Sequence, residues 1–118
     1  MKLIQDMGAQ GDVLFRRVDK LPKGLKEVDP KAVRKVVAHS ETGHHHAIDE
    51  MGVKMYQGDD PLRCYLMLES VEHCDVVHHR PHDTHETIRL FGGGGVGSVF
   101  QVRRQREYTP QGWRRVED

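Results

Sequence analysis

The chain has 118 residues, which is enough for one ordinary domain with a real core and too few for two domains of usual size. Lys plus Arg and Asp plus Glu both number 18, so the formal net charge is zero and no global field attracts the protein to nucleic acid or to a membrane. There is no apolar run of about 18 residues and no export-type N-terminus, which favours reduced thiols at Cys64 and Cys74. We therefore predict a single cytoplasmic domain over residues 1–118.

The first third of the chain contains two segments with strand character. Residues 12–18, DVLFRRV, alternate in the manner of a half-buried strand, and the Pro and Gly of residues 21–24 predict a turn after it. The segment Pro30–Ala38 is ambiguous, because Asp-Pro is a good helix start whereas its three valines favour a strand. We favour the strand.

The remaining segments continue the β pattern. Residues 53–56, 63–69 and 71–79 are rich in β-formers and predict a meander, and the Gly-rich residues 91–97 predict a hairpin tip. The clearest strand covers residues 98–108. The Thr-Pro-Gln-Gly turn after it leads into a last strand from Trp113, so we predict a C-terminal hairpin.

This succession of short strands indicates an all-β fold. We expect a compact small barrel or sandwich of roughly eight strands, with at most one short helix.

The first candidate site is the segment from His39 to His46, which holds four of the nine histidines. On an extended strand His44 and His46 share a face with Ile48, which suggests an inward direction, whereas His45 lies on the other face. Two neutral imidazoles on one face can chelate a divalent transition metal such as Zn, Fe, Ni or Mn, with Glu50 as a third ligand. Three protein ligands would leave an open coordination position.

A second histidine cluster occupies residues 78–86 and could complete that site. His82 and His85 are the candidate ligands, and Pro81 argues for a loop rather than a regular helix around them. The alternative is that these histidines are partly exposed loop and strand-end residues that make backbone hydrogen bonds.

The second candidate site is basic. Phe100, Val102, Arg104 and Arg106 share one strand face, along which apolar residues give way to arginine. Arg104 and Arg106 could therefore lie at the mouth of a barrel or sandwich and bind a carboxylate or phosphate, for which the guanidinium group is suited. The alternative is a solvated strand end paired with nearby acids.

Two resemblances concern the same histidines. His44, His46 and Glu50 resemble part of the first cupin motif, which implies a metal site on a small barrel, although the second cupin motif is absent and the glycine spacing differs. The blocks QGDVLFRRVDKLP, AHSETGHHHAI and RRQREYTPQGWRRVED resemble a small uncharacterised protein family found in bacteria and their phages. That family's Thr-Gly-His-x-His pattern also points to His44 and His46.

Three functions stay open at this point. The leading one is a histidine-rich metal-binding β-domain, with a metal-dependent enzyme as one form of it and no catalytic residue assigned. The others are a module that binds a small anionic ligand or nucleotide through His and Arg, and a structural protein of a phage particle or complex. The balanced charge disfavours nucleic acid, and a homo-oligomer stays open. If phage-encoded, the protein would occupy the host cytoplasm or the virion.

Overall fold

A computed structural model gives the fold of most of the chain. It describes residues 2–28, 30–32, 34–38, 46–49, 51–78, 87–92, 97–104, 106–109 and 112–115, the last two ranges by their backbone alone. All regular structure in these ranges is β-strand.

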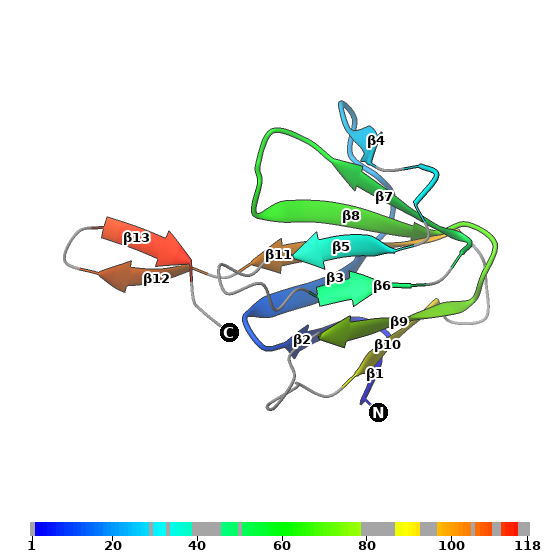
Figure 1. Ribbon diagram of the computed structural model, residues 1–118, viewed down its shortest axis with the longest axis horizontal. Coiled ribbons are helices and arrows are strands. Elements are labelled where there is room, and N and C mark those ends of the chain that lie inside the picture. The colour runs from blue at the N-terminus through cyan, green and yellow to red at the C-terminus, as the bar shows by residue number, and fades with distance from the viewer. Residues whose placement is uncertain are drawn as a thin grey trace.

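Two sheets contain most of the strands (Figure 1). The five-stranded sheet has the order β1 (Lys2–Ile4), β10 (Ile88–Phe91), β9 (His73–His78), β6 (His46–Ile48) and β5 (Lys35–Ala38). The six-stranded sheet has the order β2 (Met7–Gln10), β3 (Val13–Val18), β11 (Ser98–Arg104), β8 (Arg63–Leu68), β7 (Val53–Gln57) and β4 (Lys26–Val28). A separate pair consists of β12 (Arg106–Thr109) and β13 (Gly112–Arg115).

The strands pair as their patterns require. Neighbours are antiparallel except for β1, which lies parallel to β10. Successive side chains of a strand point to opposite faces, so β9 buries Cys74, Val76 and His78 and leaves the residues between them partly exposed. In the other sheet Phe100 of β11 lies opposite Leu66 of β8, and both are fully buried.

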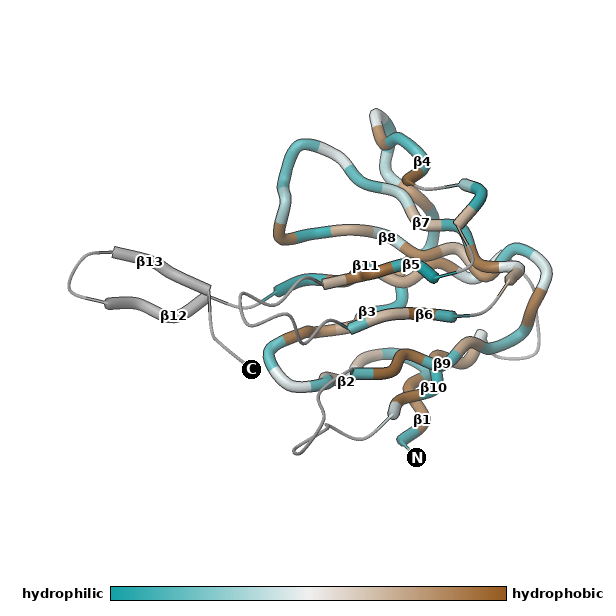
Figure 2. The backbone as a smooth tube through the Cα atoms, viewed as in Figure 1, coloured by the Kyte–Doolittle hydropathy of each residue, from teal (hydrophilic) through white to brown (hydrophobic). Residues whose placement is uncertain are grey.

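The hydrophobic core lies between the two sheets. Apolar residues follow the central strands of both sheets in Figure 2, and residues of both form one buried cluster. Burial of this apolar surface is the main favourable contribution to folding. Phe15, Phe100, Leu66 and Leu68 are its largest completely buried members from the six-stranded sheet.

The prediction of an all-β fold is confirmed, in its sandwich form. The sheets end at different edge strands, β4 and β5 among them, so they do not close into one barrel. Within the described ranges, no helix is long and apolar enough to cross a membrane.

Several local predictions are also confirmed. The strand expected at residues 12–18 is β3, and the ambiguous Pro30–Ala38 segment ends in the strand β5. The C-terminal hairpin exists as β12 and β13, in which Thr109 lies opposite Gly112.

The long strand predicted over residues 98–108 is wrong. Strand β11 ends at Arg104, and β12 begins at Arg106 in a different sheet. The alternation of residue types continues across this break, because a side-chain pattern of period two cannot indicate where the backbone changes its partner strand.

The predicted meander and the Gly-rich hairpin tip are wrong for a related reason. Strands β7 and β8 do pair, but β9 lies in the opposite sheet between β10 and β6. The Gly-rich segment likewise connects β10 of one sheet to β11 of the other. A strand with one buried face has the same local pattern in either sheet of a sandwich, so the pattern does not assign the sheet.

Candidate functional site

A cluster of polar side chains interrupts the apolar interface between the sheets. Its members come from β2, the β2–β3 turn, β6, β9 and the end of β11. They are Gln10, Asp12, His46, His78 and Arg104, which are 2%, 4%, 0%, 0% and 8% exposed. Polar groups removed from water are costly unless they find partners, so the contacts within this cluster are decisive.

His46 and Gln10 join the two sheets through directed hydrogen bonds. Gln10 Nε2 donates to the carbonyl of Val76 at 2.9 Å, which identifies the other amide atom, Oε1, as the acceptor. His46 Nδ1 lies 2.8 Å from this Oε1 and therefore donates to it. In neutral His46 the lone pair is then on Nε2, which lies 3.8 Å from Oδ1 of Asp12.

Asp12 and Arg104 form a buried ion pair. The two atoms Nη2 of Arg104 and Oδ2 of Asp12 are 3.1 Å apart, and the side chains are 5% and 1% exposed. Asp12 therefore lies between a guanidinium group and an imidazole. The chain brings these residues together from positions 92 apart in sequence.

Arg104 has donors that this ion pair does not use. A guanidinium group carries five N–H donors, and Nη2 is the atom that binds Asp12. Its Nε and Nη1 are buried and have no hydrogen-bond partner among the residues that the structure describes. Arg104 thus presents buried donor atoms that an acceptor could engage.

Arg104 also lines a cavity of about 290 Å³ between the sheets. The walls come from β4, β5, β7, the start of β8 and the end of β11, and consist of Val28, Val36, Val37, Ala38, Met55, Gln57, Pro61, Leu62, Arg63, Cys64 and Arg104. The backbone N–H of Arg104 donates to the carbonyl of Leu62, and Val102 lies opposite Cys64. This register explains why the end of β11 closes the cavity.

Two further wall residues differ in their chemical roles. Arg63 lies opposite the exposed Arg103, but its Nε is buried and has no hydrogen-bond partner among the described residues, so Arg63 adds a second guanidinium group to the wall. Burial raises the pKa of the Cys64 thiol to about 12, and its Sγ lies 3.5 Å from the carbonyl oxygen of Val37. A thiol that stays protonated is a poor nucleophile, so Cys64 acts here as an apolar wall residue.

The two histidine clusters of the sequence meet in the five-stranded sheet. His46 of β6 lies opposite His78 of β9, and their rings stack with centroids 4.1 Å apart and planes at 13°. An imidazole lone pair lies in the ring plane, so two nearly parallel stacked rings direct their lone pairs to separate positions. In this arrangement both rings cannot bind one ion.

The metal prediction rests on residues that the structure largely leaves out. His44, Glu50, His82 and His85 lie outside the described residues. Among the residues that are described, no group of three or more His, Cys, Asp or Glu side chains could hold a metal ion. The second histidine cluster does reach His46, but the member that the structure places there is His78.

Of the two arginines predicted to form a basic site, the structure describes the side chain of one. Arg104 is on the inner face of β11 together with Phe100 and Val102, as the alternation predicted. Arg106 belongs to β12, and its side chain lies outside the described part of the chain. Arg104 is also buried rather than solvated.

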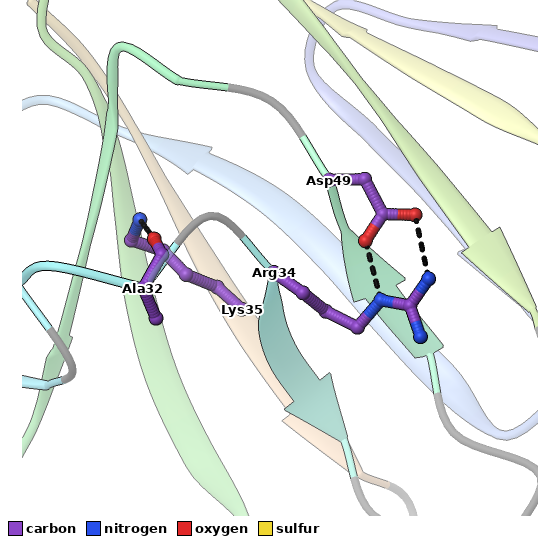
Figure 3. Close-up of polar contacts among 4 residues, drawn as sticks. All are labelled: Ala32, Arg34, Lys35 and Asp49. Carbon is purple, nitrogen blue, oxygen red and sulfur yellow. Dashed lines mark hydrogen bonds and ion pairs between the residues drawn. The ribbon is translucent and has the colours of Figure 1, made fainter.

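Asp49, directly after β6, is exposed and binds an arginine outside this cluster. Arg34 binds its carboxylate through Nε at 2.6 Å and Nη2 at 3.4 Å, as Figure 3 shows. The same figure shows Nζ of Lys35 donating to the carbonyl of Ala32 at 2.8 Å. The Asp49 hydrogen bond and charge raise the pKa of Arg34, and both side chains are exposed. This pair ties the end of β6 to the start of β5.

Sequence reasoning missed Gln10 and Asp12. Asp12 follows Gly11 in the turn between β2 and β3, a position where an aspartate is usually attributed to turn formation. Gln10 ends a four-residue strand that the sequence did not reveal. The QGDV block contains both residues, but nothing local indicates that their side chains enter the interior.

Fold and site together define a class: an open β-sandwich with a buried His–Asp–Arg cluster beside a small cavity. The chain belongs to the family DUF8820, a domain of unknown function, whose model matches residues 9–105. This range begins one residue before Gln10 and ends one residue after Arg104, so it contains the whole cluster. No curated protein and no solved structure matches the chain.

Proposed function

We propose that this domain binds a small anionic molecule in the cavity between its sheets, with Arg104 as the anchor. The observation that carries the proposal is the pair of buried donor atoms, Nε and Nη1, of Arg104, a residue that lines a 290 Å³ cavity. Within the described residues these atoms have no acceptor, and Arg104 is buried by the protein itself.

The energetics support a ligand at this position. A buried donor without an acceptor costs about 1–3 kcal/mol, and an oxygen atom bound there would offset that cost. Hydrogen bonds from guanidinium to an ionised oxygen are about twice as strong as neutral ones. The cavity lies near the lower end of the roughly 300–1,000 Å³ usual for ligand sites, which favours a small ligand.

The test compares two arginines that are adjacent on β11. Arg104→Lys keeps a positive charge for Asp12 but removes the planar set of donors, whereas Arg103→Lys makes the same change at an exposed position. Thermal unfolding would be measured with carboxylates and phosphates at millimolar concentration. A ligand that binds only the folded state raises the melting temperature, so the shift should persist in Arg103→Lys and vanish in Arg104→Lys. Equal shifts in both variants would contradict the proposal.

A divalent transition metal bound by His44 and His46 is the second candidate. One observation favours it: Nδ1 of His46 donates a hydrogen bond to Gln10 at 2.8 Å, and a histidine that binds a metal through one ring nitrogen usually donates from the other in this way. Glu50, His82 or His85 would supply the further ligands. This proposal needs residues beyond the described ranges.

Elemental analysis of untagged protein tests the metal. The double change His44→Ala with His46→Ala should remove stoichiometric metal, whereas His45→Ala should leave it nearly intact. Occupancy should also fall as the pH drops through about 6, because imidazole must be neutral to bind a metal. Equal loss from each single variant would instead indicate a non-specific chelating segment, and untagged protein that gains no metal would remove this candidate.

A structural role in a phage particle or complex remains a prediction. It requires self-association, which sedimentation of the purified chain over a range of concentrations would measure.

A further inference from the structure

We infer that the ligand of the cavity is a monocarboxylate with a short apolar tail. This inference rests on the proposed function, since it specifies the molecule that Arg104 would bind. Three properties of the cavity carry it: the composition of the walls, the balance of charge and the volume.

Most of the residues that line the cavity have apolar side chains. Aliphatic and sulfur-containing side chains supply most of the lining, namely Val28, Val36, Val37, Ala38, Met55, Leu62 and Cys64. The Cys64 thiol belongs with them because burial raises its pKa to about 12 and keeps it neutral. These side chains offer a ligand no hydrogen-bond partner, so the part of the wall that they form favours a tail of carbon atoms, whereas the polar groups of Gln57, Arg63 and Arg104 favour a charged or polar head.

The charge balance favours a single negative charge. Arg104 and Arg63 both line the cavity, and Asp12 neutralises Arg104 across a buried distance of 3.1 Å, so one positive charge is left on the wall. A phosphate dianion would therefore exceed that positive charge by one, and it costs more to desolvate than a monoanion. A neutral amide would add none, but its hydrogen bonds to guanidinium would lack the additional strength of an ionised acceptor. A carboxylate is the best compromise between these two costs.

The volume limits the length of the tail. A cavity of 290 Å³ has room for roughly ten water-sized groups, since each water occupies about 30 Å³. Hexanoate is within this limit, whereas long-chain fatty acids exceed it.

Titration calorimetry with three matched six-carbon ligands tests the head group. Hexanoate, hexanamide and hexyl phosphate would be titrated into the full chain at pH 7.5. We expect hexanoate to bind at least tenfold more tightly than either of the others, and Arg104→Lys to weaken it at least tenfold while Arg103→Lys does not. Tighter binding of the amide or the phosphate would overturn the inference.

A series of carboxylates tests the tail. From acetate to hexanoate the affinity should rise about fourfold per methylene, because each buried methylene contributes about 0.8 kcal/mol. Ala38→Val places two additional methyl groups on the cavity wall and should flatten this rise, whereas Ala9→Val, outside the lining, should leave it unchanged. A rise that is absent from the wild type would contradict an apolar tail site.

The outcomes separate this inference from the function on which it rests. If no compound of the panel binds, or if binding persists in Arg104→Lys, both fail. If hexyl phosphate or hexanamide binds best and Arg104→Lys abolishes that binding, the anchor at Arg104 stands and only the monocarboxylate is wrong.

Discussion

The two parts of the space between the sheets are built on different principles. Around Phe15, Phe100 and Leu66 the sheets meet through apolar side chains, all completely buried. Around Asp12 and Arg104 they meet through charges and directed hydrogen bonds, at a similar depth. Apolar burial in the first part stabilises the sandwich and is not directional. The hydrogen bonds and the ion pair of the second part require each partner at a defined distance and angle.

This difference shows where function is to be sought. Apolar packing accepts many residues of the right size, and it accounts for the fold by itself. A buried ion pair adds little net stability compared with apolar residues of the same volume, because both charges lose their hydration. The position of this pair beside a cavity therefore supports the proposed binding site more than it accounts for stability.

The largest expected effect is in the apolar part. Phe100→Ala removes a ring that is 0% exposed and lies opposite Leu66, so it should lower the free energy of unfolding by about 3–5 kcal/mol. Urea denaturation measures it. Leu3→Ala, which truncates a residue that is 66% exposed, serves as the control and should change little. Equal effects at the two positions would mean that the sheets do not pack as described.

In the polar part, the effects of substitutions at Asp12 and Arg104 on the free energy of unfolding should depend on each other. Arg104→Met leaves Asp12 buried without its guanidinium partner and should cost roughly 3 kcal/mol. Adding Asp12→Leu should recover much of this loss, because the charge that was stranded is then gone. A double-mutant cycle by urea denaturation measures the coupling. Additive losses would show that the two side chains do not interact.

Alkaline pH should weaken the fold through Cys64. Its pKa is raised from 9.0 to about 12 by burial, so the folded state favours the neutral thiol. This contribution to stability is complete below about pH 9 and is lost as the pH rises towards 12. Other groups titrate in the same range, so the measurement is the stability difference between wild type and Cys64→Ala. That difference should narrow from pH 9 to 12, and a constant difference would contradict the burial of the thiol.

The smallest effect belongs to the surface. The Arg34–Asp49 pair is exposed on both sides, with side chains 60% and 41% accessible, so solvent and salt screen it. Arg34→Ala should leave the melting temperature unchanged within error at about 0.5 M salt, because the Debye length is then only a few ångströms. A clear loss at that salt concentration would show that the pair stabilises the β5–β6 hairpin.

The sequence alone determined the fold class and several elements. Alternating runs such as residues 12–18, and the turn before Gly112, contain their structural information within a few neighbouring residues. The same alternation placed Phe100, Val102 and Arg104 on one inward face. Periodicity and turn chemistry are local properties, so they can be read without knowledge of the fold.

Only the tertiary structure decided which strands share a sheet and which polar residues meet. The neighbouring residues Gln10 and Asp12 are far from His46 and from Arg104 in the chain, and no spacing rule connects these three positions. Their contacts depend on two features of the fold. Strand β9 lies in the sheet opposite that of β8, and β11 ends at Arg104. A strand with one buried face pairs equally well by its own pattern in either sheet, so the packing of the whole domain makes that choice, and with it the position of the site.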